Sequence, residues 1–200
     1  KRMPADTYKS QRRGGKGITG ISTRADDFVT EIFTASTHDT ILFFSNKGKL
    51  YRLRGYEIPE AGRTAKGTAI VNLLSLDPGE KITAVIPISN FAEGKCLLMA
   101  TQKGFIKKTA LTEYNSARKT GLQAITLKEE DELIAVRLTD GQDNVVLVTE
   151  DGTRLKPEVS LNNSTTRFKL PFPALITKFI AATYLFILFW TSLLYFSSSS

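Results

Sequence analysis

The sequence is poor in the residues that build disulfide-stapled and metal-binding proteins. It has one cysteine, Cys96, and one histidine, His38, in 200 residues. A single cysteine cannot form a disulfide within the chain, which favours a reducing, cytoplasmic location, and we expect Cys96 to be a small core residue on a strand. His38 has no cysteine or acidic partner at metal-ligand spacing, so we expect a surface residue near the start of a strand.

Signals for export and for catalysis are also missing. The first residues are charged and no apolar segment follows them, so no signal peptide is expected at this end. No nucleophile stands near a base in a recognisable arrangement. We therefore expect neither a catalytic centre nor a metal or cofactor site within these residues.

The chain has fewer acidic than basic residues. Lys and Arg number 27 against 20 Asp and Glu, which gives a net charge of +7 and a pI near 9.5. The excess lies at the N-terminus, where one acid, Asp6, faces the basic residues Lys1, Arg2, Lys9, Arg12, Arg13, Lys16 and Arg24. A polyanionic partner is favoured over an acidic protein role. The hydrophobic content of 42% is sufficient for a buried core.

Long stretches of helical periodicity are absent too, and short β-rich runs separated by turn residues replace them. This pattern predicts an all-β fold. The expected strands are Phe28–Ala35, Thr40–Ser45, Lys49–Arg54, Thr68–Leu74, Ile82–Ile88, Lys95–Thr101, Phe105–Thr109, Leu133–Thr139 and Asn144–Thr149.

The turns repeat along the chain. ILFFSNKGKLYRL is echoed by LLMATQKGFIKKT and by VLVTEDGTRLK, with Gly48, Gly104 and Gly152 where a tight hairpin needs positive φ. A basic loop, Arg63–Ile70, is matched by Arg118–Ile125. A period of about 50 residues suits a four-stranded propeller blade, so we predict a partial β-propeller of about two and a half blades, in the β-pinwheel form.

From Pro157 the repeat pattern ends. A stretch rich in Ser, Thr and Asn leads into an apolar region, and the run from Phe179 to Phe196 carries no charge. So abrupt a change is typical of a frameshift or a fusion with unrelated sequence, and we favour that interpretation. A membrane segment is the alternative, with Arg167, Lys169 and Lys178 on its cytoplasmic side. The expected organisation is a basic linker over residues 1–27, the partial propeller over 28–156 and an unrelated tail over 157–200.

One basic segment combines cations with a flexible backbone. In QRRGGKG, three cations alternate with three glycines, so the backbone can approach a phosphate chain closely while the side chains neutralise it. The expected DNA-binding residues of this segment are Gln11, Arg12, Arg13, Gly14, Gly15, Lys16 and Gly17. A solvated basic linker is the alternative for the same residues.

This segment resembles the box that distinguishes DNA gyrase A subunits from the A subunits of topoisomerase IV. The stretch from Asp26 to Ile82 is similar to the first blade of the C-terminal propeller in the gyrase A family. The likeness extends over residues 1 to about 156. It implies a ring-shaped propeller whose positive outer belt wraps double-stranded DNA, with the box setting the handedness of the wrap.

The resemblance also implies which parts lie elsewhere. The enzyme would introduce negative supercoils as an assembly of two A and two B subunits, with ATP and Mg²⁺ bound outside this chain. The tyrosine that attacks DNA belongs to an upstream winged-helix domain, so no tyrosine here takes that role, and no cofactor is expected in this piece of the A subunit.

Further cations recur at matched places in the repeats. Four residues past each turn glycine stand Arg52, Lys108 and Lys156, and strand alternation predicts the same face for all three. The expected belt also includes Lys47, Lys103, Arg63, Lys66, Arg118 and Lys119. Solvated surface cations are the alternative. Phosphate contacts of this kind predict weak sequence preference and strong salt dependence.

Two rival functions remain open. The C-terminal domain of a topoisomerase IV A subunit is the nearer one, and the intact box argues against it. A non-enzymatic propeller with a membrane anchor is the other, and it requires the apolar tail to be genuine.

Overall fold

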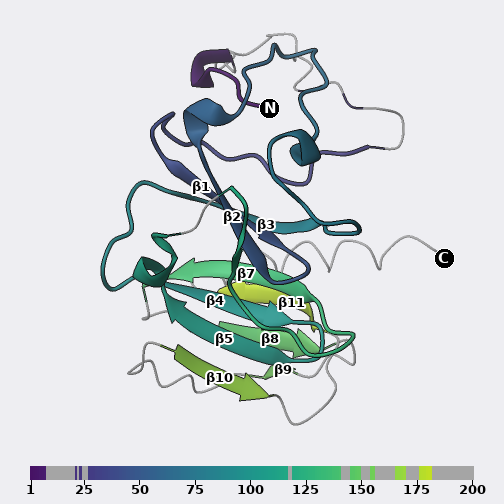
Figure 1. Cartoon of the computed structure of the whole chain (residues 1–200), viewed down its shortest axis with the longest axis vertical. Helices are drawn as coiled ribbons and strands as arrows, with labels where there is room; N and C mark the ends of the chain where they lie inside the picture. The colour runs from purple at the N-terminus through teal and green to yellow at the C-terminus, as the bar shows by residue number, and fades with distance from the viewer. Residues whose placement is uncertain are drawn as a thin grey trace, which may run out of the picture.

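The computed structural model describes residues 1–7, 21, 23, 27–116, 119–140, 145–149, 154–155, 165–169 and 176–181, with only the backbone described from residue 145 on. The described residues contain strands and short 3₁₀ helices but no α-helix, which confirms the all-β prediction (Figure 1). The strands are β1 (Thr40–Ser45), β2 (Lys49–Arg54), β3 (Ile82–Ile88), β4 (Cys96–Thr101), β5 (Phe105–Ala110), β6 (Leu122–Gln123), β7 (Leu133–Thr139), β8 (Val145–Thr149), β9 (Arg154–Leu155), β10 (Thr165–Lys169) and β11 (Ile176–Ala181). The 3₁₀ helices are η1 (Ala5–Thr7), η2 (Gly55–Glu57), η3 (Ile70–Asn72) and η4 (Leu111–Tyr114).

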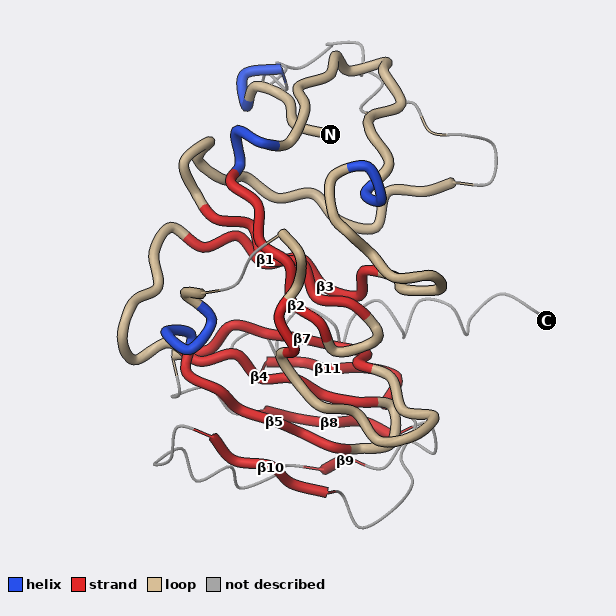
Figure 2. Tube along the Cα trace, viewed as in Figure 1, coloured by secondary structure: helices blue, strands red, loops and turns tan. Residues whose placement is uncertain are grey.

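The strands form three antiparallel sheets (Figure 2). Their orders are β3-β1-β2-β6, β7-β4-β5-β10 and β11-β8-β9, so each sheet is built around one of the repeated hairpins. The first two sheets also share an irregularity in strand pairing. The β1–β3 register shifts between Phe44 and Ser45, and the β4–β7 register shifts at the matched place, between Ala100 and Thr101. The predicted count of about two and a half blades agrees with two four-stranded sheets and one three-stranded sheet.

The outer strand of the first sheet comes from the second repeat. Lys49 and Leu50 of β2 pair with Gln123 and Leu122 of β6, which follows the hairpin of the second blade. The two blades are thus joined by backbone hydrogen bonds as well as by side-chain packing.

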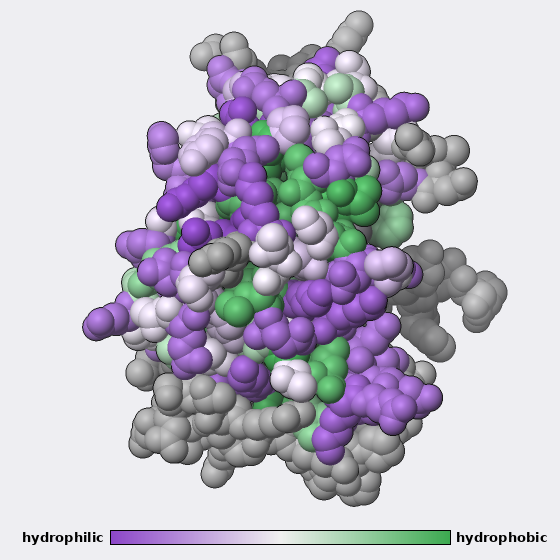
Figure 3. All heavy atoms as spheres, in the orientation of Figure 1, coloured by the Kyte–Doolittle hydropathy of each residue, from purple (hydrophilic) through white to green (hydrophobic). Residues whose placement is uncertain are grey.

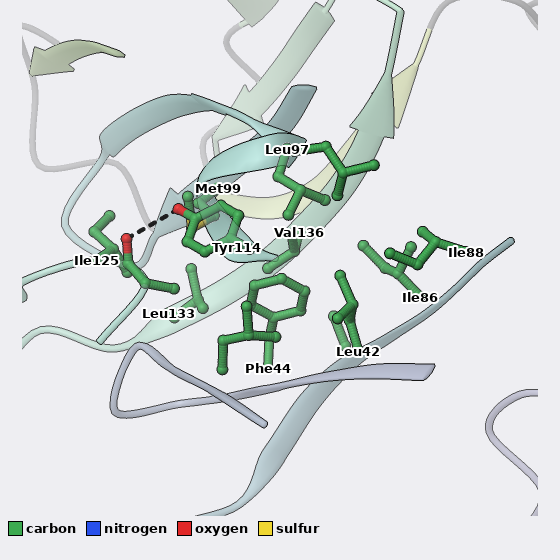
Figure 4. Packing of buried hydrophobic residues seen from close by; sticks show 14 residues of the cluster. Leu42, Phe44, Ile86, Ile88, Leu97, Met99, Tyr114, Ile125, Leu133 and Val136 are labelled. Carbon is green, nitrogen blue, oxygen red and sulfur yellow. Dashed lines mark hydrogen bonds between the residues drawn. The ribbon is translucent and has the colours of Figure 1, made fainter. Parts of the chain in front are cut away.

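The main core lies between the first two blades. Strand alternation directs Leu42 and Phe44 of β1 towards Leu97, Met99 and the loop that carries β6, and these side chains are fully buried (Figure 4). The hydroxyl of Tyr114 donates a 3.2 Å hydrogen bond to the carbonyl of Ala124 in this core. A second cluster covers the other face of β1, where Ile41 and Phe43 pack with residues such as Leu53 and Leu74. Both faces of β1 are therefore buried.

Two expected strands are not formed. Phe28–Ala35 pairs with no described strand and is exposed, because a strand forms only where a free neighbouring edge is available for backbone pairing. Thr68–Leu74 contains η3 instead, and Leu73 and Leu74 cover the second cluster as parts of a loop. The expected strand Asn144–Thr149 is β8, with Asn144 outside the described residues.

The C-terminal segment contributes strands that the sequence did not predict. β10 pairs with β5, as β6 pairs with β2, and β11 pairs with β8, as β3 pairs with β1. The backbone after Pro157 thus occupies blade positions where we expected the pattern to stop. The origin of residues 157–200 stays a prediction.

The described residues contain no helix long and apolar enough to cross a bilayer. Of the uncharged run from Phe179 to Phe196, the first three residues belong to β11, and the remainder lies outside the described residues. The membrane alternative for that remainder is a prediction that the structure does not test.

Candidate nucleic-acid interface

The lysines that precede the turn glycines have the same geometry in both blades. Lys47 and Lys103 are exposed, and Gly48 and Gly104 adopt φ of 75° and 80°. The Lys47 ammonium donates to the Pro78 carbonyl at 2.8 Å, and the Lys103 ammonium donates to the Glu129 carbonyl at 2.8 Å. Each lysine is thereby held over the loop that leads into the next strand, and the Lys103 ammonium also lies 3.8 Å from the Glu130 carboxylate.

The strand cations occupy equivalent registers but differ in exposure. Arg52 lies opposite Leu42 and Lys108 lies opposite Leu98, which confirms that they are matched positions. Arg52 is half-buried and donates to the Asn115 carbonyl at 2.8 Å, whereas Lys108 is only 4% exposed. The loop of the second blade covers Arg52, and β10 pairs alongside Lys108, opposite Thr166. The two matched positions therefore differ in how far they reach the surface, and the DNA contact expected of each stays a prediction.

The basic loop of the first blade is built around a lysine from the N-terminus. The Lys1 ammonium donates to the carbonyls of Gly62, Arg63 and Ala65 at 3.0, 2.7 and 2.7 Å. Gly67 has a φ of 80°, and a side chain there would meet Lys1 Cβ at 3.2 Å. Lys66 is exposed and Arg63 is half-buried on this loop.

Arg2 holds the same segment by backbone and side-chain bonds. Its N–H donates to the Pro59 carbonyl at 3.2 Å, its carbonyl accepts from the Ala61 N–H at 3.0 Å, and its guanidinium lies 3.3 Å from the Glu60 carboxylate. Sequence reasoning counted Lys1 and Arg2 only as part of a basic cluster. A lysine and an arginine close to the chain start carry no signal that would reveal such contacts.

Lys119 bridges the two blades. Its ammonium lies 2.6 Å from a carboxylate oxygen of Glu57 in η2. Burial raises the pKa of Glu57, but the Arg54 backbone N–H and the Lys119 ammonium outweigh burial and lower that pKa. The carboxylate is thus held ionised beside its partner. Lys119 therefore has a structural contact in addition to the DNA contact expected of it.

Several expected site residues fall outside the described residues. They are the whole box, Gln11, Arg12, Arg13, Gly14, Gly15, Lys16 and Gly17, together with Arg118 and Lys156. Their part in DNA binding rests on the sequence alone.

In the part of the chain that the structure describes, no group of three or more His, Cys, Asp or Glu residues could hold a metal ion. His38 is exposed just before β1, as expected, and its ring packs edge-on against Tyr56 at 6.2 Å. Cys96 opens β4 and is half-buried, so the prediction of a core position is only partly right.

A family model matches most of the chain. The family model for the DNA gyrase C-terminal domain, a β-propeller, matches residues 1–36, 39–89 and 97–140. The chain belongs to the DNA gyrase C-terminal domain family. This confirms the resemblance inferred from the box and the first repeat.

Curated relatives of this family are similar over most of the chain. The DNA gyrase A subunit of Clostridium acetobutylicum is 56% identical over 156 residues, which is 78% of this chain and 19% of the relative. The corresponding protein of Halalkalibacterium halodurans is 51% identical over the same length. The chain thus spans about a fifth of the length of the curated relatives it matches.

Solved structures agree with the fold. The C-terminal domain of a DNA topoisomerase IV has a TM-score of 0.63 at 30% identity, covering 74% of this chain and 48% of that domain. A DNA gyrase A C-terminal domain has a TM-score of 0.62 at 24% identity, covering 90% of this chain and 60% of that domain. This chain therefore spans less than two thirds of that solved domain.

Proposed function

We propose that this chain binds and bends duplex DNA as part of the wrapping domain of a gyrase A subunit. Membership in the gyrase C-terminal domain family is the observation that carries the proposal. The net charge of +7 and the dense basic cluster before residue 25 support it, because phosphate neutralisation is the main source of non-specific DNA affinity.

The described cations divide into two groups under this proposal. Lys47, Lys66 and Lys103 are exposed and would reach phosphates directly. Arg52, Lys108 and Lys119 are half-buried, buried or paired with a neighbouring blade, so their main contribution would be to hold the blades in the arrangement that DNA meets.

The whole enzyme extends beyond these residues. In a gyrase, this region would supply wrapping while a B subunit supplies ATP hydrolysis with Mg²⁺, and the complex would act on chromosomal DNA in the cytoplasm. The chain itself would need no cofactor, and DNA cleavage would be carried out by another domain of the A subunit.

A second candidate has a specific observation behind it. A topoisomerase IV C-terminal domain is 30% identical to this chain and shares its fold. The two candidates differ in one activity, since only the gyrase assignment predicts that the box confers negative supercoiling.

The test uses a complete subunit. In the A subunit of the Clostridium acetobutylicum relative, the matching segment is replaced by residues 1–156 of this chain. The hybrid A subunit is assembled with the B subunit of that organism, and the complex is incubated with relaxed plasmid and ATP. We expect negative supercoiling, and we expect its loss when Arg12, Arg13 and Lys16 are all changed to Ala, while ATP-dependent relaxation of supercoiled plasmid is kept. Supercoiling by the triple variant at the unmutated rate would refute the role of the box and leave a solvated linker.

A further inference from the structure

The ammonium of Lys1 lies among backbone carbonyls of the basic loop of the first blade. Figure 3 shows hydrophilic residues over much of the upper end of the molecule, where Figure 1 places the start of the chain. The ammonium donates to the carbonyls of Gly62, Arg63 and Ala65 at 3.0, 2.7 and 2.7 Å. An ammonium has three N–H donors, so these bonds use all of them. A phosphate could bond to Lys1 only by displacing a carbonyl.

The basic loop bends sharply around this lysine. The Ala65 N–H donates to the Gly62 carbonyl at 3.1 Å, which closes a turn. Gly67 follows with a φ of 80°, and a side chain there would meet Lys1 Cβ at 3.2 Å. Lys66 stands between the turn and this glycine and is exposed. Contacts with Lys1 on both sides of Lys66 therefore set where that exposed cation stands.

Arg2 holds the backbone that carries Lys1. It pairs in parallel with Glu60, and its guanidinium lies 3.3 Å from the carboxylate of the same residue. Its Nε also donates to the Ile58 carbonyl at 3.1 Å. Lys1 is thus presented to the loop by a backbone that is fixed against the segment leading into that loop.

The basic loop of the second blade is approached by a cation at the matched place. Arg52 donates to the carbonyl of Asn115, which stands three residues before Arg118, the start of that loop. Arg2 pairs with Glu60, which likewise stands three residues before the start of the loop in the first blade. An arginine from an earlier part of the chain contacts the approach to each basic loop, and the first loop has Lys1 in addition.

We propose that Lys1 is a positioning residue for DNA binding, which holds the basic loop of the first blade so that Lys66 neutralises a phosphate. Lys1 acts through Lys66 and makes no phosphate contact of its own. The proposal rests on the proposed function, because it requires Lys66 to face DNA. It assigns one cation of the basic N-terminal cluster to the shape of a loop and not to the DNA.

A double-mutant cycle on the salt dependence of DNA binding tests the proposal in the 200-residue chain. Lys66→Ala should lower the log–log slope by about 0.9, the value for one phosphate. Lys1→Met removes the ammonium but keeps an unbranched side chain, and it should lower the slope by up to the same amount. The double variant should show no further loss, because both changes remove the same contact.

Two results of the cycle would overturn the proposal. A loss of about 1.8 in the double variant would make Lys1 a phosphate contact in its own right. An unchanged slope in Lys1→Met would leave Lys1 with a structural contact that DNA binding does not use.

Lys47 provides the matched control, because it is exposed on the same blade but stands on a different turn. Lys47→Ala combined with Lys1→Met should lower the slope by the sum of the two single effects, since the two changes are independent. A smaller combined loss would show that Lys1 acts on the blade as a whole and not on Lys66, which would contradict the positioning role.

Hydrogen exchange without DNA measures the loop itself. In Lys1→Met, the Ala65 amide should exchange at least about threefold faster, because the turn opens more often. The Phe43 amide of β1 should keep its rate, which shows that the blade is still folded. An unchanged Ala65 rate in a chain that still binds DNA would overturn the positioning role alone. An unmutated chain that binds no DNA would refute the proposed function and the positioning role together.

Discussion

Asn46 of the first blade donates a hydrogen bond of 3.2 Å from its side-chain amide to the carboxylate of Glu132 in the second blade. Its backbone carbonyl accepts from the Leu133 N–H at 2.8 Å, and its side-chain oxygen accepts from the Lys81 N–H at 2.9 Å. One turn residue thus connects both blades with the loop between them.

Removing this side chain should weaken the blade junction. Asn46→Ala leaves the Lys81 N–H and the Glu132 carboxylate without these partners, and we expect a loss of about 1–3 kcal/mol in the free energy of unfolding. Asn72→Ala is the control at an exposed position and should change that energy by less than about 0.5 kcal/mol. Urea unfolding of the 200-residue chain measures both, and equal effects would show that the Asn46 contacts carry no stability.

Gly48 tests the same junction between the blades, because the backbone of the second blade lies close to it. A Cβ at Gly48 would overlap the Ile125 carbonyl oxygen, whereas a Cβ at Gly79 would meet nothing within 4 Å. Both glycines have a φ of 75°, so alanine costs each of them about 1–2 kcal/mol of backbone strain.

Gly48→Ala should therefore destabilise the chain well beyond Gly79→Ala, because only the first must also separate the turn from the second blade. Thermal unfolding of the two variants gives the comparison. If their melting temperatures agree, the contact between Gly48 and Ile125 is absent in solution.

A buried carboxylate in the first blade predicts how stability depends on pH. Glu80 accepts hydrogen bonds from the Tyr51 hydroxyl at 2.7 Å and from the Asp77 N–H at 2.8 Å. Burial raises the pKa of Glu80, but bonds from Ser45, Asp77 and Tyr51 outweigh burial and lower that pKa below 4.5. Burial and the bond to Glu80 raise the pKa of Tyr51 above 10.

The two shifts act at opposite ends of the pH scale. Because the pKa of Glu80 is lowered on folding, its contribution is present above about pH 4.5 and is lost as pH falls through the folded value. The contribution of Tyr51 is present below about pH 10 and is lost as pH rises towards its raised pKa.

Glu80→Gln should lower the stability plateau at neutral pH and flatten the decline below about pH 4.5. Glu93→Gln, at an exposed site, should leave the whole profile unchanged. Denaturant unfolding at a series of pH values measures both, and an acid decline of unchanged slope in Glu80→Gln would place the responsible carboxylate elsewhere.

Two cations of the first blade should differ in whether they contribute to stability or to DNA binding. Arg52→Ala removes the bond to the Asn115 carbonyl and should cost about 1 kcal/mol of stability. Lys66→Ala should leave stability unchanged and weaken binding to duplex DNA, because Lys66 is exposed. Melting curves and a DNA-binding titration on both variants test this, and a reversed pattern would mean that the roles are assigned the wrong way round.

The sequence predicted the hairpins because their signal is local. Gly48 and Gly104 mark turns between alternating strands, and β1, β2, β4 and β5 lie where that pattern placed them. It could not predict β6, since two residues carry no periodicity and their partner strand belongs to another blade. The β-rich composition of Phe28–Ala35 predicted a strand there. A strand also needs a neighbouring strand to pair with, and the local sequence does not show whether one is present.

The sequence predicted which cations occupy matched positions in the blades, but it did not predict how exposed each side chain is. Strand alternation correctly matched Arg52 with Lys108, but the coverage of each depends on which element packs beside it, and β10 or a loop of the next blade is not visible in local sequence. The contacts of Lys1 with the Gly62–Ala65 carbonyls were missed for the same reason, because they join residues far apart in the chain.

The salt dependence of binding between the 200-residue chain and duplex DNA tests the central claim most directly. We expect non-specific binding whose logarithm falls linearly with the logarithm of salt concentration, with a slope of about 0.9 for each phosphate neutralised. Changing Arg12, Arg13 and Lys16 to Ala should reduce that slope by up to about 2.7 if each contacts one phosphate. Binding that is absent at low salt or independent of salt, or a slope that the three substitutions leave unchanged, would contradict the account.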